Sequence, residues 1–146
     1  MTQLSDHVAE FKAKAENLPG ARRFDDADLE MIYTVAYGIY QKGDYRRAVT
    51  HFSFLTLYRP TSPRYLKGLG ASQFMVRQYA AAAATYAFLL LIHPRDAETL
   101  CMYGHAKLLL GERKEANDAL AQAARLRHGP SEFTERAEAL LELIAD

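Results

Sequence analysis

The sequence predicts an all-α protein, a short right-handed solenoid of stacked helix pairs, and three observations predict it. Residues of similar size recur at intervals of 34 positions through most of the chain. Within each interval, apolar residues recur at helical spacing in two separate stretches. Glycine, proline and capping residues stand between those stretches. Internal repetition at this period is typical of helical repeats that bury a continuous core by stacking.

The aligned positions agree in size across three units. The matched sets are Ile32, Leu66 and Leu100; Ala36, Gly70 and Gly104; Ala48, Ala82 and Ala116; and Phe52, Tyr86 and Leu120. Small residues let two antiparallel helices approach closely, and bulky residues fill the space beside them. This is the tetratricopeptide pattern. We therefore expect three tandem tetratricopeptide repeats, at about residues 29–62, 63–96 and 97–130.

Each repeat is expected to contain two helices. Their predicted ranges are 29–41 and 45–58, 63–75 and 79–92, and 97–109 and 113–126. Gly43-Asp44 and Gly111-Glu112 mark the turns inside the first and third repeats. Ser62-Pro63 places a capping residue before a proline at the first helical position.

Two further helices are expected at the ends of the chain. Residues 131–146 combine apolar residues at helical spacing with glutamates, as a C-terminal capping helix of a stacked array requires, and complete a repeat domain at residues 25–146. Residues 5–18 are amphipathic, and residues 1–24 are interpreted as an N-terminal helix and linker. The apolar face of that helix consists of Leu4, Val8, Phe11, Ala15 and Leu18. Whether it packs on its own chain or on a second copy stays open.

Composition and charge narrow the function classes. The 146 residues are 49% hydrophobic and 25% charged, which is ordinary for a globular protein. The net charge is zero, but residues 31–95 carry eight basic side chains and one acid, and both flanking segments are acidic. A single cysteine excludes an internal disulfide, and no signal peptide or membrane span is visible, so we expect a cytoplasmic protein.

The basic residues of the middle segment do not predict nucleic-acid binding. They are Lys42, Arg46, Arg47, Arg59, Arg64, Lys67, Arg77 and Arg95. They lie singly at turns and helix starts, not in one stripe with interleaved aromatic residues. The alternative interpretation is solvated charge, in part paired with the acidic ends.

No motif predicts catalysis, a cofactor or a metal site. Gly68-Leu69-Gly70 lies inside a helix at the small-residue position, so it is not interpreted as a phosphate-binding loop. Glu98, Cys101 and His105 share a helical face, but nothing nearby supplies an oxyanion pocket or further zinc ligands. We expect no enzyme; a hydrolase or metal protein using Cys101 and His105 is the least favoured alternative.

The first helix of each repeat is expected to line a concave groove, because one helical face carries the second, fifth, ninth and twelfth positions of each unit. These residues are Glu30, Tyr33, Tyr37 and Tyr40; Arg64, Lys67, Ala71 and Phe74, with Met75 beside them; and Glu98, Cys101, His105 and Leu108. A mixture of apolar and hydrogen-bonding rings is typical of peptide-recognition surfaces. The alternative is that the three tyrosines belong only to the core.

Several segments resemble one family. They are Leu29–Tyr37, Tyr40–Tyr45, Phe52-Ser53-Phe54-Leu55, Lys67-Gly68-Leu69-Gly70-Ala71 and the turn at Gly111-Glu112. Together they resemble the class II type III secretion chaperones, small cytoplasmic tetratricopeptide proteins that hold translocator subunits before secretion. The resemblance covers roughly residues 25–126, and it departs from the family in a short N-terminal extension and in a third repeat without a closing proline.

The resemblance implies a chaperone whose groove captures an extended, proline- and leucine-containing segment of a hydrophobic client. The client would be a secreted translocator, and Tyr33, Tyr37, Tyr40, Ala71 and Phe74 would form pockets for its side chains. A homodimer stays open, and no membrane insertion is expected. The alternatives are a needle-subunit co-chaperone and a generic adaptor that assembles a complex. A basic rim beside the groove would favour a client with acidic flanks, or hold the acidic N-terminal arm of the chain.

Overall fold

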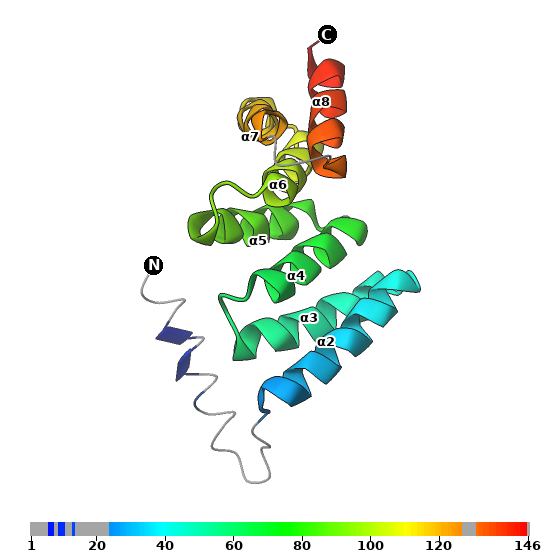
Figure 1. The fold of residues 1–146 in the computed structure, drawn as a ribbon, viewed down its shortest axis with the longest axis vertical. Helices are drawn as coiled ribbons and strands as arrows, with labels where there is room; N and C mark the ends of the chain where they lie inside the picture. The colour runs from blue at the N-terminus through cyan, green and yellow to red at the C-terminus, as the bar shows by residue number, and fades with distance from the viewer. Residues whose placement is uncertain (1–5, 8, 11–12, 14–23, 127–130, 146) are drawn as a thin grey trace.

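The computed structural model describes residues 6–7, 9–10, 13, 24–126 and 131–145. Within residues 24–126 and 131–145, seven helices follow one another and no strand interrupts them. They are α2 (Asp26–Gln41), α3 (Tyr45–Tyr58), α4 (Pro63–Met75), α5 (Tyr79–Ile92), α6 (Ala97–Leu109), α7 (Arg113–Arg125) and α8 (Glu132–Ile144). Figure 1 shows them stacked in sequence order from α2 and α3 at one end to α8 at the other. The predicted all-α solenoid is confirmed.

Capping side chains determine where the helices begin. Asp25 accepts a hydrogen bond from the backbone N–H of Asp28 at 2.8 Å, and the Asp28 carboxylate accepts one from the N–H of Asp25 at 3.2 Å. This reciprocal capping box starts α2 at Asp26, three residues before the predicted Leu29. Ser62 caps α4, whose first residue is Pro63, as the sequence indicates.

The turns within the three repeats share one backbone conformation. Gly43, Arg77 and Gly111 lie 34 residues apart, and their φ angles are 84°, 65° and 80°. This left-handed region costs an L-residue about 1 kcal/mol and costs glycine almost nothing. The second repeat therefore makes the same turn as its neighbours with an unfavourable residue.

In the second and third repeats, the two helices approach so closely that the small position has no room for a side chain. A Cβ atom built on Gly70 would lie 2.7 Å from Cζ of Tyr86, and one built on Gly104 would lie 2.7 Å from Cγ of Leu120. Ala36 occupies the equivalent position in the first repeat and is fully buried. The helices pack at the positions where the repeat alignment predicts contact.

A second close approach joins neighbouring repeats. A Cβ atom built on Gly68 of α4 would lie 2.2 Å from Cε1 of Phe52, which belongs to α3. Phe52 is only 1% exposed and belongs to the buried cluster of the first repeat, so its ring is held in place by its neighbours. This contact sets the spacing between the first and second repeats.

The C-terminal helix α8 closes one end of the array. Its apolar residues join the buried cluster that contains Cys101 and Leu120. They are Phe133, Ala137, Leu140, Leu141 and Ile144. Leu143 lies outside this cluster and is 72% exposed.

Most of the predicted N-terminal helix and linker lies outside the described residues. Asp6, His7, Ala9, Glu10 and Ala13 are described there; all five are helical and exposed. Over the described part of the chain, no helix is both long and apolar enough to cross a membrane.

Replacing Arg77 by glycine should stabilise the protein. Glycine adopts the left-handed turn without the steric cost of a Cβ atom, and Arg77 is exposed, so little else is lost. We expect the free energy of unfolding to rise by about 0.5–1 kcal/mol, measured by urea denaturation. Gly111→Ala should lower the free energy of unfolding by a similar amount. Equal urea midpoints for the two variants would show that the left-handed turn does not affect stability.

Two glycine-to-alanine substitutions should have opposite effects. Gly68→Ala forces a methyl group against the Phe52 ring and should cost about 1–3 kcal/mol of unfolding free energy. Gly38 lies in α2, where an added methyl group would meet no side chain within 4 Å, so Gly38→Ala should gain about 0.5–1 kcal/mol through helix propensity. Thermal unfolding followed by circular dichroism distinguishes the two, and a Gly68→Ala variant that is as stable as Gly38→Ala would refute the close approach.

Candidate functional site

A cavity of about 420 Å³ lies where the first helices of the repeats meet. Its lining residues are Tyr33, Tyr37 and Tyr40 of α2; Arg64, Lys67, Gly68 and Ala71 of α4; Glu98 of α6; Phe52 of α3; and Glu132 of α8. We call this cavity the concave groove. Seven of the thirteen predicted groove residues line it: the three tyrosines, Arg64, Lys67, Ala71 and Glu98.

The tyrosines of α2 are supported from behind by other rings. Tyr33 stacks on Tyr37 with ring centroids 6.2 Å apart, and its other neighbours are Phe52 at 6.0 Å and Tyr65 at 5.6 Å. Tyr33 and Tyr40 pack on the buried cluster of the first repeat, and Tyr37 is 48% exposed. The rings are therefore held by the core, and they also form the wall of the groove.

Tyr40 lies beside Tyr45, the first residue of α3, with ring centroids 5.2 Å apart. Burial, and after it the neighbouring tyrosines Tyr45 and Tyr37, raise the pKa of its hydroxyl above the ordinary value. The hydroxyl is thus protonated at neutral pH and can donate a hydrogen bond.

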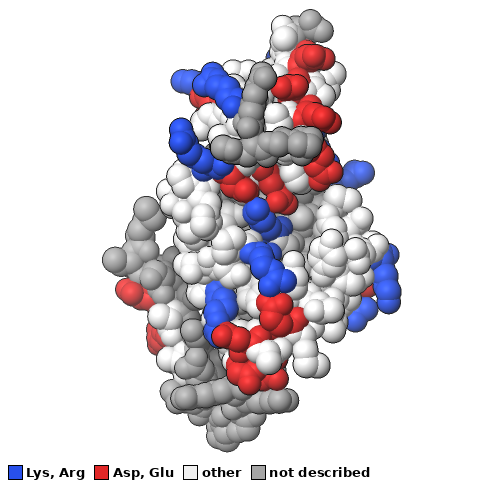
Figure 2. All heavy atoms as spheres, in the orientation of Figure 1, with Lys and Arg blue, Asp and Glu red and all other residues white. Residues whose placement is uncertain are grey.

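Ion pairs connect the first helices of successive repeats along the groove. The guanidinium of Arg64 pairs with Glu30 of α2 and lies 4.2 Å above the Tyr33 ring. Nζ of Lys67 lies 3.1 Å from Asp96 and 3.0 Å from Glu98. In Figure 2 basic side chains lie in a run down the middle of the face shown, and acidic side chains lie above and below them. The cations of α4 are thus neutralised by acids of α2 and of the N-terminal end of α6, which belong to the repeats before and after it.

These contacts account for the charge states beside the groove. Burial alone would lower the pKa of Lys67, but hydrogen bonds to Glu98 and Asp96 outweigh it and raise the pKa. Burial alone would raise the pKa of Asp96, but hydrogen bonds from Thr99 and Lys67 lower it. Both groups therefore stay charged at neutral pH, and the ammonium group of Lys67 at the rim of the groove is paired with acids.

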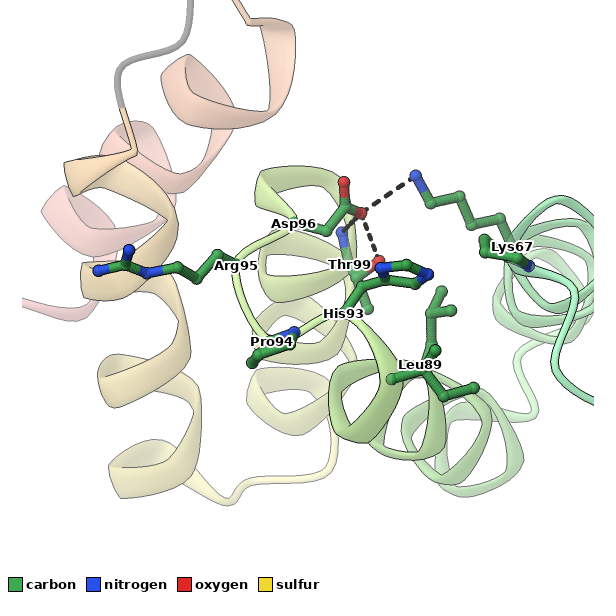
Figure 3. A pocket seen from close by; sticks show the side chains of 9 residues that line it. Lys67, Leu89, His93, Pro94, Arg95, Asp96 and Thr99 are labelled. Carbon is green, nitrogen blue, oxygen red and sulfur yellow. Dashed lines mark hydrogen bonds and ion pairs between the residues drawn. The ribbon is translucent and has the colours of Figure 1, made fainter.

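Asp96 and Lys67 also line a second cavity of about 470 Å³ that the sequence does not predict. It lies between the start of α4 and the loop that joins α5 to α6 (Figure 3). Asp96 caps α6 by accepting a hydrogen bond from the N–H of Thr99 at 3.1 Å. Arg95 points away from Lys67 in this view. Lys67 borders both cavities, so the second cavity adjoins the concave groove.

The remaining predicted groove residues lie elsewhere. Cys101 is fully buried in the cluster to which Ala137 of α8 belongs, so the expectation that it faces the groove is wrong. A C-terminal capping helix is expected from the sequence, but its packing on α6, beside Cys101, is not. Met75 is 42% exposed and lines a different cavity, beside the turn at Gly43.

Phe74, His105 and Leu108 are partly buried, and none of the three lines the groove cavity. The ring centroids of Phe74 and His105 lie 4.9 Å apart. Conversely, Phe52, Gly68 and Glu132 line the cavity without having been predicted as groove residues. Glu132 carried no signal beyond a helix-start charge, because its position depends on how α8 packs.

The alternative site at Cys101 and His105 lacks an activated nucleophile. Burial raises the pKa of the Cys101 thiol to about 11, so the thiol is protonated at neutral pH. Burial lowers the pKa of His105, and its Nδ1 atom has no hydrogen-bond partner among the described residues. The described residues also contain no cluster of three or more potential metal ligands.

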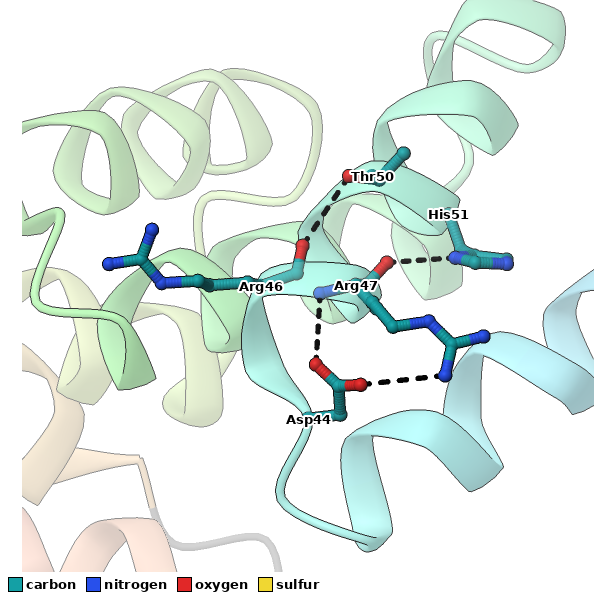
Figure 4. A network of polar contacts seen from close by, with 5 residues as sticks. All are labelled: Asp44, Arg46, Arg47, Thr50 and His51. Carbon is teal, nitrogen blue, oxygen red and sulfur yellow. Dashed lines mark hydrogen bonds and ion pairs between the residues drawn. The ribbon is translucent and has the colours of Figure 1, made fainter.

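Basic residues at the start of α3 form local contacts only. Arg47 pairs with Asp44 at 3.5 Å, and its carbonyl oxygen lies 2.8 Å from Nδ1 of His51. Arg46 and Arg47 extend to opposite sides of the helix (Figure 4). This arrangement presents no continuous basic stripe at α3.

Comparison with known proteins gives one consistent set of relatives. The tetratricopeptide repeat family matches residues 29–61 and 63–96. Low calcium response locus protein H of Yersinia pestis is 29% identical over 119 residues, which cover 80% of this chain and 71% of that protein.

Two solved structures have a similar fold. PcrH of Pseudomonas aeruginosa has a TM-score of 0.80 and 25% identity, covering 88% of this chain and all of that one. SycD, the type III secretion chaperone of Yersinia enterocolitica, was solved in complex with a peptide of the translocator YopD. It has a TM-score of 0.77 and 28% identity, and the match covers 85% of this chain and 97% of that one.

The bridge at Lys67 should make stability depend on pH. Because the pKa of Asp96 is lowered in the folded state, its stabilising contribution is present above the unfolded pKa of about 4 and is lost as the pH falls from about 5 through the folded pKa. Asp96→Asn retains a capping side chain but removes the charge, so it should cost about 1 kcal/mol at pH 7 and less at pH 3.5, where Asp96 is partly protonated. Urea unfolding at several pH values measures this difference.

Glu138→Gln is the matched control, since Glu138 is exposed on α8. It should change the unfolding free energy little at either pH. An Asp96→Asn cost that is the same at pH 7 and pH 3.5 would show that the ion pair does not stabilise the fold.

Proposed function

Since the chain belongs to the class II type III secretion chaperones, a family of tetratricopeptide-repeat proteins, we propose that it binds and masks a secreted translocator before secretion. An extended segment of that client lies in the concave groove. The observation that carries this assignment is the cavity walled by Tyr33, Tyr37 and Tyr40, which is open to a ligand. The complex of SycD with a peptide of its translocator supports the class of client.

The chemistry of the wall suits an extended apolar segment. Tyrosine rings offer flat apolar faces for proline and leucine side chains, and their hydroxyl groups bond main-chain atoms that an extended segment leaves unpaired. Tyr37 is half exposed and Ala71 opposite is small, so ring faces remain accessible. Aromatic-lined grooves recognise extended proline-containing peptides in the same manner.

The groove acts by binding, and the client leaves it unchanged. A translocator carries apolar surface that would aggregate in water, and contact with the groove keeps part of that surface covered. We place this activity in the cytoplasm, where the client waits for secretion. No enzymatic step is part of the proposal.

Tyr40→Ala should weaken client binding by about 2 kcal/mol, roughly thirtyfold, if this ring is an anchor. The measurement is isothermal titration calorimetry with peptides that tile candidate translocator proteins of the same organism. Tyr40→Phe retains the ring and loses only the hydroxyl, so it should lose less affinity than Tyr40→Ala. Circular dichroism verifies that each variant is folded.

Phe88→Ala is the matched control, because Phe88 is an aromatic residue with 42% exposure that does not line the groove. The Phe88→Ala variant should bind the client peptide with the same affinity as the unchanged protein. If no translocator peptide binds the folded protein, the client class is wrong. If a peptide binds and Tyr40→Ala has no effect, the client is right and the groove is not its site.

A further inference from the structure

Helix α5 carries an apolar stripe that no described element covers. The stripe consists of Ala80, Ala84, Phe88 and Leu91, and we call it the α5 face. Phe88 is 42% exposed and Leu91 is 81% exposed, although no residue of α5 is charged. An isolated exposed leucine is ordinary, whereas a helix that is apolar on every side is normally covered.

The other repeats show that this face is not a requirement of the fold. The residues 34 positions after Phe88 and Leu91 are Gln122 and Arg125, which suit a helix facing water. The residues 34 positions before them are Phe54 and Leu57. The first and second repeats thus share an apolar outer surface that the third repeat lacks.

In the first repeat this surface is covered by the chain itself. The ring of Phe24 packs edge-to-face on Phe54 at 5.5 Å and on Tyr58 at 5.4 Å. Phe24 stands between α2 and the N-terminal residues, so the chain enters the structure across the outer surface of α3. Phe88 and Leu91 of α5, which are equivalent to Phe54 and Leu57 of α3, form the next apolar surface along the array.

We propose that the N-terminal segment, residues 4–18, is the occupant of the α5 face and binds it with its own apolar side. The apolar side chains of the segment, Leu4, Val8, Phe11, Ala15 and Leu18, recur at helical spacing and lie outside the described residues. The described residues of the segment are helical and exposed, and none of them belongs to this apolar set. An amphipathic helix with its other side toward water therefore suits this sequence.

The chain is long enough for this contact. Five residues lie between Leu18 and Phe24, so six Cα-to-Cα steps of about 3.3–3.6 Å each bridge up to about 20–22 Å. Helices α3 and α5 both pack against α4, and packed helices lie about 8–10 Å apart, so their axes are at most about 20 Å apart. Ala80 and Ala84 allow a second helix to approach closely, with Phe88 and Leu91 as the large contacts. This contact does not depend on the proposed client.

Disulfide trapping in the full chain tests the proposal. Leu91→Cys is combined in turn with Val8→Cys, Phe11→Cys and Ala15→Cys, because a disulfide requires Cα atoms within about 7 Å. The native Cys101 is fully buried and does not interfere. Leu143→Cys, at a similarly exposed leucine on α8, is the control partner.

At least one Leu91 pair should give an intramolecular cross-link at tenfold or more the yield of the Leu143 pairs. Disulfide-linked dimers alone would mean that a second copy occupies the α5 face and would overturn the proposal. Equal yields for both partners would overturn it as well. Hydrogen exchange gives an independent measurement: Phe88→Ser should speed exchange of residues 4–18 at least tenfold, and Leu110→Ser should leave it unchanged.

Discussion

The contact between the two helices of each repeat is the constraint on which the rest of the structure depends. Gly70 and Gly104 leave no space for a methyl group against Tyr86 and Leu120, so the helix pairs of the second and third repeats each have one permitted separation. That separation repeats along the array and places the first helices side by side. The tyrosines of α2 then face α4 across a gap of fixed width. The width of the groove thus depends on how closely its lining helices pack against the helices behind them.

Electrostatics follow from the same stacking. The basic middle of the chain and its acidic ends meet across repeat boundaries, where Arg64 pairs with Glu30, and Lys67 pairs with Asp96 and Glu98. The interpretation that some basic residues pair with the acidic ends is confirmed. Pairs of this exposure contribute at most about 1 kcal/mol each, and they also determine where the side chains point. The rim cations Arg64 and Lys67 are already neutralised, which leaves the aromatic wall as the dominant feature of the groove.

The repeat period made most of the fold predictable, because helix bounds follow directly from a 34-residue pattern with visible caps. The start of α2 differs, since the reciprocal bonds of Asp25 and Asp28 depend on side-chain geometry that the period does not encode. The α2 and α4 side of the site was predictable for the same reason. The prediction that Cys101 faces the groove was wrong, and Glu132 was not predicted to line it. Both errors have one cause. Helical spacing tells which face a residue occupies, but not that α8 packs across the third repeat.

The position of α8 also limits how much of a partner the groove can read. This helix packs across the third repeat and adds Glu132 to the cavity, so the cavity ends at α8. Three neighbouring first helices at about 8–10 Å spacing give about 20 Å between the outer axes. An extended chain at about 3.3 Å per residue places about six residues over that distance. So short a stretch contains few side chains, and unrelated proteins that share one brief motif can therefore use the same chaperone.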